Sequence, residues 1–351
     1  MQKLIAPAVA SLLLAGCGAA PDNATADPTG SPVDSAVEES PDLLVVSTVA
    51  PVADIVAQVL GDRGRVESLI PEGMDSHTYE PRPGDVAPLL EADLFIGNGL
   101  GLNQAAVDLA EANLPDGVPL VLLGEEALTD DDLSHEHWHD HGDEGSHSHG
   151  DEDGHSHGDG APEGGFNPHV WTSVPNMVAY VEVVAQVLTA VDPEGADHYA
   201  QRAEEYRVEL EALDDAIRAA VGSLAEERRK LVVYHDAWAY FGHEYGVQVI
   251  AAVQPSDYSE PSAADVRAII DQIRAEDVPA IFGAEEFPND VVAAIADETG
   301  AEYVGELADD TLPGSPGDPQ HSYVGMMAEN VSRVVDALGG DPTPLRALTG
   351  R

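Results

Sequence analysis

Short apolar runs rich in β-branched residues alternate with helix-like segments along most of this chain, and this alternation is what most constrains its fold. The first run, LLVVSTV at residues 43–49, is typical of a strand buried on both faces. Strands that alternate with helices build parallel sheets covered by helices, so the sequence predicts an α/β protein. The later runs are RVESLI (65–70), DLFIGNG (93–99), VPLVLL (118–123), LVVYH (231–235), VQVIAAV (247–253), VPAIFG (278–283) and EYVGEL (302–307).

A long helical pattern separates these runs into two groups. From Tyr199 to Leu224, apolar residues recur at alternating steps of four and three, which makes one stripe along a helix of ~45 Å. A coiled-coil partner is an alternative, but one helix between two α/β halves favours packing within the chain. We therefore expect two parallel-sheet α/β lobes joined by one long linking helix. The expected divisions are an N-terminal lobe at 42–192, the linking helix at 193–226, a C-terminal lobe at 227–340 and a tail at 341–351.

The N-terminus carries an export pattern. Lys3 precedes an apolar run, Leu4 to Leu14, which is too short for a resident membrane helix. The run ends in Leu-Ala-Gly-Cys, which resembles a bacterial lipoprotein signal; a plain secretory signal is the alternative. The resemblance implies a signal peptide at 1–16, lipidation of Cys17, a disordered tether at 17–41, and anchoring to the outer face of the cytoplasmic membrane.

Composition restricts the chemistry further. The chain has 65 acidic and 15 basic residues, a net charge of −50, so its surface repels nucleic acid and attracts cations. An organism whose proteins are generally acidic is an alternative explanation of this charge, and it gives the charge no functional role. Cys17 is the single cysteine, which excludes internal disulfides and means that a metal site must use histidine and carboxylate ligands.

A histidine-rich loop at 130–165 contains eight of the 14 histidines. His135 to His139 match H-E-x-x-H, but no apolar face accompanies the match, so a protease helix is not expected there. We interpret the loop as an accessory that collects metal weakly and in no single geometry; a solvated loop without a role is the alternative. Its histidines are His135, His137, His139, His141, His147, His149, His155 and His157.

Three other histidines are better placed for a defined site. His77 and His169 lie in loops before helices, and His235 ends the run LVVYH. Ligands bind open α/β sheets at the carboxyl ends of strands, so these three histidines are metal-ligand candidates.

The segments around these histidines resemble the metal-binding solute-binding proteins of bacterial ABC importers, the ZnuA-type zinc and manganese receptor family. In that family one histidine follows a glycine turn and precedes Tyr-Glu-Pro, as His77 does in GMDSHTYEP. A second lies in an Asn-Pro-His-x-Trp segment, as His169 does. A third position ends a second-lobe strand before an aromatic helix, as His235 does in HDAWAYF. The similarity covers roughly residues 43–340.

The resemblance also implies a fourth ligand, an acid after the last strand. Asp310 matches it best by register, and Asp309 is the rival. Two positions depart from the family pattern: Ala284 stands where an acid is frequent, with Glu285 one place later, and Ser76 stands where many relatives have proline. We expect His198 and His243 to be surface or structural residues and His321 to cap the last helix. Ser262 with Asp265 predicts another helix cap.

By this resemblance, the chain is a monomeric receptor, not an enzyme, that delivers Zn²⁺ bound in the cleft between the lobes to an ABC permease and its ATPase. Three imidazoles and a carboxylate suit zinc, whereas manganese prefers more oxygen ligands. A histidine at the third position is also more frequent in zinc members. The alternatives are a manganese receptor, an extracellular zinc buffer or adhesin without a permease, and a zinc hydrolase. Copper and nickel also bind imidazole well.

Overall fold

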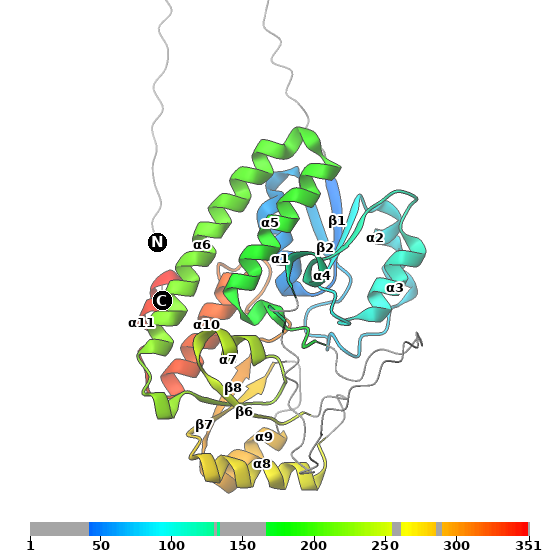
Figure 1. Cartoon of the computed structure of the whole chain (residues 1–351). Coiled ribbons are helices and arrows are strands. Elements are labelled where there is room, and N and C mark those ends of the chain that lie inside the picture. The colour runs from blue at the N-terminus through cyan, green and yellow to red at the C-terminus, as the bar shows by residue number, and fades with distance from the viewer. Residues whose placement is uncertain (1–41, 130–131, 134–165, 255–260, 286–289, 350–351) are drawn as a thin grey trace, which may run out of the picture. The chain divides into compact units, whose positions relative to one another are not determined.

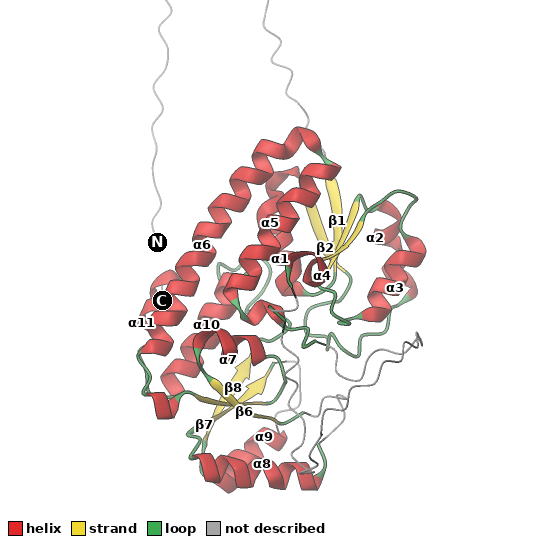
Figure 2. Cartoon of the chain, viewed as in Figure 1, coloured by secondary structure: helices red, strands yellow, loops and turns green. Residues whose placement is uncertain are grey.

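A computed structural model describes residues 42–129, 132–133, 166–254, 261–285 and 290–349. The expected signal peptide, Cys17, the tether and all eight histidines of the histidine-rich loop lie outside the described residues. Figures 1 and 2 show the arrangement of helices and strands in the part that is described.

Two four-stranded parallel sheets form the framework, which confirms the predicted α/β class. The first sheet has the order β2-β1-β3-β4 and the second β6-β5-β7-β8, so both halves repeat one topology. All five residues of β1 and of β7 are buried, as expected for parallel strands covered on both faces. The strands are β1 (Leu43–Ser47), β2 (Gly64–Ser68), β3 (Leu94–Gly97), β4 (Leu120–Leu122), β5 (Lys230–Val233), β6 (Gln248–Ala252), β7 (Ala280–Ala284) and β8 (Glu302–Leu307).

Helices follow the strands in the order that the sequence predicts. A helix in the expected tail, α11, packs on α6 and α10. Helix α5 is apolar and long enough to cross a membrane by length and composition, but its buried face packs on α1, α4 and α6, as in a core helix. Besides α6, the helices are α1 (Ala50–Leu60), α2 (Val86–Glu91), α3 (Gln104–Asn113), α4 (Leu123–Ala127), α5 (Val174–Val191), α7 (Ala239–Tyr245), α8 (Ala263–Glu276), α9 (Asp290–Thr299), α10 (Tyr323–Ala337) and α11 (Thr343–Leu348).

The long helix α6 spans Ala196–Gly222, between the last helix of the first half and the first strand of the second. Its apolar stripe is buried from Tyr199 to Leu224, except for the partly buried Ala203. The stripe packs on α1 and α5 from the first half and on α10 and α11 from the second. Contacts within the chain therefore cover the face that a coiled-coil partner would need. Figure 1 shows α6 running alongside α5 and α10.

Helix α10 returns to the first half of the chain. The backbone N–H of Tyr323 donates to Asp54 Oδ2 in α1 at 2.8 Å, and its hydroxyl donates to the carbonyl of Trp171 at 2.7 Å. The cap of α10 is Ser322, whose hydroxyl accepts from the N–H of Gly325 at 3.0 Å. The prediction that His321 caps this helix is therefore wrong, because the serine hydroxyl occupies the capping position.

Candidate metal centre

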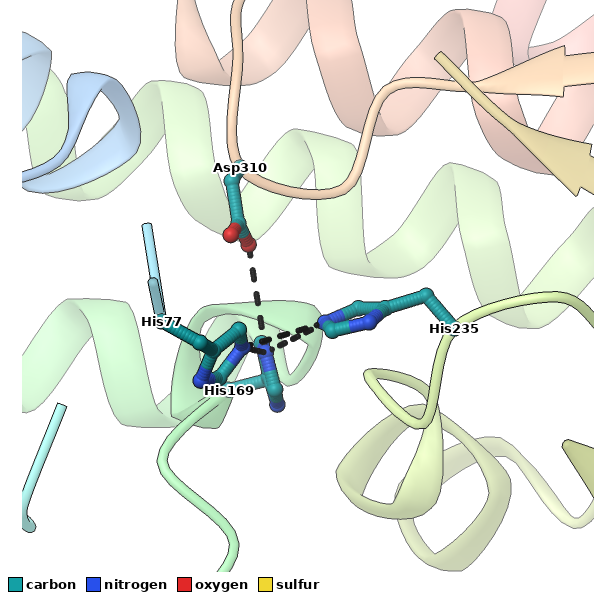
Figure 3. Close-up of side chains that lie close together, drawn as sticks. All are labelled: His77, His169, His235 and Asp310. Atoms are coloured by element: carbon teal, nitrogen blue, oxygen red, sulfur yellow. Dashed lines mark hydrogen bonds and ion pairs between the residues drawn. The ribbon is translucent and has the colours of Figure 1, made fainter. Parts of the chain in front are cut away.

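The four predicted ligands come from four separate loops. His77 lies between β2 and α2, and His169 lies just before a short 3₁₀ turn that leads into α5. His235 follows β5, and Asp310 follows β8. Strands β5 and β8 belong to the same parallel sheet, so these last two loops leave its carboxyl edge. Figure 3 shows the four side chains pointing toward one another.

The ligand atoms of these residues converge within 4.8 Å of one another. The Nε2 atoms are 2.9 Å apart between His77 and His169, 2.9 Å between His169 and His235, and 3.2 Å between His77 and His235. Asp310 Oδ1 lies 3.9 Å from His169 Nε2. Ligands at ~2.0–2.2 Å from a tetrahedral ion lie about 3.4 Å apart, so the spacing of these atoms suits one four-coordinate ion.

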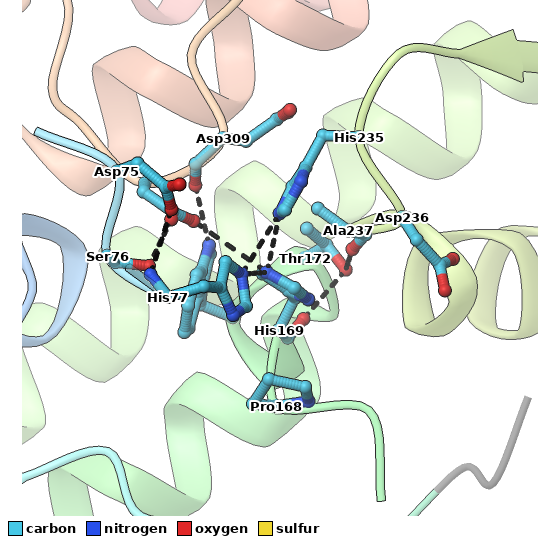
Figure 4. A network of polar contacts seen from close by, with 12 residues as sticks. Asp75, Ser76, His77, Pro168, His169, Thr172, His235, Asp236, Ala237 and Asp309 are labelled. Atoms are coloured by element: carbon cyan, nitrogen blue, oxygen red, sulfur yellow. Dashed lines mark hydrogen bonds and ion pairs between the residues drawn. The ribbon is translucent and has the colours of Figure 1, made fainter. Parts of the chain in front are cut away.

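Hydrogen bonds at the far side of two rings fix their tautomers. His169 Nδ1 lies 2.7 Å from Asn167 Oδ1, and His235 Nδ1 lies 2.9 Å from Gln254 Oε1. Both partners are acceptors, so each Nδ1 carries the proton and each Nε2 presents its lone pair to the cluster. Figure 4 shows part of the polar network in which His169 and His235 lie. Asn167 belongs to the Asn-Pro-His motif, but neither its contact with His169 nor that of Gln254 with His235 was predicted from the sequence.

Asp310 is buried and has two unequal oxygens. Oδ2 accepts a short hydrogen bond from the Ser76 hydroxyl, whereas Oδ1 has no hydrogen-bond partner among the described residues. Burial raises the pKa of this carboxyl above its ordinary value, while His235 and the Ser76 hydrogen bonds act in the opposite direction. A buried carboxylate oxygen that lacks a donor is costly unless a cation neutralises it, so Oδ1 has the character of a metal ligand.

Asp309, the rival for the fourth position, is held elsewhere. Its Oδ1 accepts from Trp238 Nε1 at 2.8 Å, and its backbone carbonyl accepts from Trp171 Nε1 at 2.8 Å. The cluster of potential ligands contains Asp310 and not Asp309. Hydrogen bonds from Trp171 and Trp238 to Asp309 therefore fix the loop that contains Asp310.

The other described histidines lie outside the cluster. His198 Nε2 lies 3.0 Å from the carbonyl of Leu60, and His243 is exposed on α7, so both have the structural or surface character expected of them. His321 Nε2 pairs with Glu72 Oε1 at 3.1 Å. Glu285 accepts from the hydroxyl of Thr311 at 3.3 Å and does not join the cluster.

A cavity of about 270 Å³ adjoins the cluster on one side. His77 is the one member of the cluster that lines it, and it is half-buried whereas the other three members are buried. Among the described residues, His77 is therefore the member of the cluster that faces this cavity. The rest of the lining is Tyr79, Leu100, Gly101, Leu102, Asn103, Gln104, Ala105, Phe166 and Pro168.

Comparison with known proteins gives the family. The family described as "ZnuA: Zinc-uptake complex component A periplasmic" matches residues 45–337. The chain is 28% identical over 330 residues to the manganese-binding lipoprotein MntA of Halalkalibacterium halodurans, covering 94% of this chain and 96% of that protein. It is 31% identical over 310 residues to the zinc-binding protein TroA of Treponema pallidum, covering 87% and 91%.

Further similarities agree with this match. The high-affinity zinc uptake system protein ZnuA of Bacillus subtilis is 27% identical over 330 residues, covering 93% of this chain and 94% of that protein. The solved structure of the periplasmic zinc-binding protein TroA superposes with a TM-score of 0.71 at 29% identity, covering 85% of this chain and 99% of that one. The chain therefore belongs to the ZnuA family of extracytoplasmic metal receptors of ABC importers, which are binding proteins and not enzymes.

Proposed function

We propose that this protein is a high-affinity zinc receptor that binds one Zn²⁺ through His77, His169, His235 and Asp310 and delivers it to an ABC permease. The observation that carries the proposal is the convergence of three imidazole Nε2 atoms and one carboxylate oxygen within 4.8 Å. Four protein ligands leave no position for a reacting water, which suits a binding protein.

Zinc rather than manganese is supported by the ligand chemistry. Nitrogen ligands outnumber oxygen three to one, and manganese lies below zinc in affinity for such sites. Hydrogen bonds from Nδ1 of His169 and His235 increase the basicity of the coordinating nitrogens. The names of the relatives do not decide between the metals, because one is described as manganese-binding and another as zinc-binding.

The proposed ion joins parts of the chain that are far apart in sequence. His77 and His169 belong to loops of the first half, and His235 and Asp310 follow strands of the second sheet. A ligand that binds only the native arrangement stabilises it by mass action. Bound zinc would therefore hold the two halves together and produce the form that the permease recognises.

The remaining parts of the proposal concern the cell surface. We propose that Cys17 is lipidated, that residues 17–41 tether a monomeric receptor to the outer face of the cytoplasmic membrane, and that the eight histidines of the loop at 130–165 collect zinc weakly. The leader sequence and the net charge of −50 support these assignments.

His235→Ala tests the function directly. Removal of a buried ligand should weaken zinc binding by at least about a hundredfold while the protein remains folded, because four ligands act as one cage. Titration calorimetry of the metal-free protein with Zn²⁺ measures this effect. His243→Ala, which removes an exposed histidine eight residues away, is the matched control and should leave the affinity unchanged.

Competition between Zn²⁺ and Mn²⁺ tests the metal. Zinc should displace manganese from the wild-type protein, whereas the reverse exchange should need a large excess of manganese. Tight zinc binding that survives His235→Ala would overturn the assigned site. A preference for Mn²⁺ in the competition would show that the protein is a manganese receptor.

A further inference from the structure

Ser76 connects the two halves of the chain beside the metal centre. Its hydroxyl donates to Asp310 Oδ2, a residue 234 positions later. Both side chains are buried, Ser76 at 1% and Asp310 at 5% relative exposure. A hydrogen bond between a hydroxyl and a carboxylate in such surroundings is stronger than one exposed to water. One oxygen of the Asp310 carboxylate is therefore committed to Ser76.

The position of Ser76 is itself fixed from the first half. The side-chain amide of Asn103 donates to the carbonyl of Ser76 through a short hydrogen bond. Asn103 adopts a left-handed conformation (φ 57°) at the start of α3 and is buried. Asparagine tolerates this conformation better than most residues. Asn103 thus holds the backbone of Ser76, and the hydroxyl has a defined place opposite Asp310.

Neighbouring contacts brace the same loop. Asp75 Oδ1 accepts from the backbone N–H of His77 at 2.9 Å, and Asp75 Oδ2 accepts from the hydroxyl of Thr78 at 2.7 Å. Figure 4 shows Asp75, Ser76 and His77 on one side of His169 and His235. The loop that presents His77 is therefore the loop that holds Asp310.

These contacts make the two oxygens of Asp310 unequal as metal ligands. Oδ2 is taken by Ser76, and Oδ1, which faces His169 Nε2 at 3.9 Å, has no hydrogen-bond partner among the described residues. We propose that Ser76 is a positioning residue that keeps Asp310 monodentate and thereby selects a four-coordinate ion. This inference rests on the proposed zinc function and adds a cause for its selectivity.

Zinc and manganese differ in how many oxygen ligands they prefer, so binding through one oxygen of Asp310 favours zinc. A carboxylate that binds through both oxygens supplies the extra oxygen ligand that manganese favours, and it raises the coordination number above four. Zinc is satisfied by three imidazoles and one carboxylate oxygen. Because Ser76 holds Oδ2, it discriminates against manganese without contacting the ion.

Ser76→Ala removes the hydroxyl with little change in shape. In the full-length protein, the preference for Zn²⁺ over Mn²⁺ should fall by about tenfold or more, the size expected for one hydrogen bond to a charged group. Substitution with Co²⁺ gives an independent readout, since four-coordinate Co²⁺ absorbs visible light much more strongly than five- or six-coordinate Co²⁺. The wild-type protein should give the strong spectrum and Ser76→Ala a weaker one.

Three further variants complete the experiment. Thr189→Val removes a hydroxyl that donates to the carbonyl of Ala185 within α5, outside the cluster, and should change neither readout. Ser76→Thr retains the hydroxyl and should retain the strong Co²⁺ spectrum. If Ser76→Ala does not fold, Asn103→Gly, which keeps the left-handed backbone and releases the Ser76 carbonyl, should lower both readouts in the same direction.

The outcomes separate this inference from the proposed function. An unchanged spectrum and an unchanged metal preference in Ser76→Ala, or a weak spectrum in the wild-type protein, would overturn the role of Ser76 and leave zinc binding intact. Failure of the wild-type protein to bind zinc tightly would instead overturn the proposed function.

Discussion

Asp192 and Arg63 form an ion pair away from the metal centre that makes stability depend on pH. Asp192 Oδ2 accepts from Arg63 Nε at 2.7 Å and from the hydroxyl of Tyr199 at 2.7 Å. Burial acts to raise the pKa of Asp192, but the hydrogen bonds from Tyr199 and Arg63 outweigh it and lower the pKa. The pair therefore stabilises the fold above the unfolded pKa of about 3.9, and this contribution is lost as pH falls through the lower folded pKa.

Asp192→Asn should lower the free energy of unfolding by about 1–2 kcal/mol at pH 7, because charged hydrogen bonds become neutral ones. The difference from wild type should shrink toward zero as the pH is lowered through the folded pKa of Asp192, which lies below its unfolded pKa. Urea unfolding at several pH values measures both effects. Asp116→Asn, at an exposed loop position, is the control and should match wild type throughout. A deficit that stayed constant with pH would show that Asp192 acts through its shape and not its charge.

Single residues also show how far the sequence could predict the site. His77, His169 and His235 stand out because each lies in a loop near a predicted strand or helix, and the family resemblance supplies Asp310. Gln254 could not be found in this way, since it reaches His235 Nδ1 from 19 residues away, just beyond β6, which pairs with β5. Glutamine has no ligand chemistry that would mark it. A contact to the far side of a ligand ring, such as that of Gln254 with His235, depends on which strands pair. The residue types alone do not show that pairing.

At the scale of elements, the start of α8 offers a direct test of local sequence control. Ser262 Oγ accepts from the N–H groups of Ala264 and Asp265 at 3.2 and 3.3 Å, and Asp265 Oδ2 accepts from the N–H of Ser262 at 2.7 Å. This reciprocal cap confirms the sequence prediction. Ser262→Ala should cost about 1 kcal/mol of stability in urea unfolding, and Ser262→Asp, which retains a capping acceptor, should cost much less. Equal losses in both variants would contradict capping as the cause.

Helices and strands were predictable where the spacing of apolar residues within the segment determines the structure. The eight apolar runs correspond to the eight strands of the described sheets, and the stripe of α6 is buried where the spacing predicts. The cap of α10 was not predicted correctly. His321 and Ser322 are adjacent polar residues, and the helix begins one residue later than expected for a His321 cap, so Ser322 is the N-cap. The order of strands within each sheet was not predictable either, since register and neighbours depend on contacts between distant segments.

At the scale of the whole molecule, the defined centre and the histidine-rich loop should be separable. The cluster of His77, His169, His235 and Asp310 uses none of the eight loop histidines. Deletion of residues 135–160 should therefore leave one tight zinc site per chain and remove only weaker binding. Calorimetry of the intact and deleted proteins measures the two phases. A variant with all eight histidines replaced by serine controls for chain length, and loss of the tight phase in either protein would move the site into the loop.

The contact between α1 and α10 has a consequence for how the protein is made. Asp54 meets Tyr323 across 269 positions of the chain, so helix α1 acquires its final neighbour only when synthesis is nearly complete. Contacts between such distant segments close slowly because the intervening chain must first be ordered. Helix α10 thus closes this part of the core late, and we expect the emerging chain to remain incompletely folded until α10 has left the ribosome. We expect such late closure to favour an unfolded polypeptide during export.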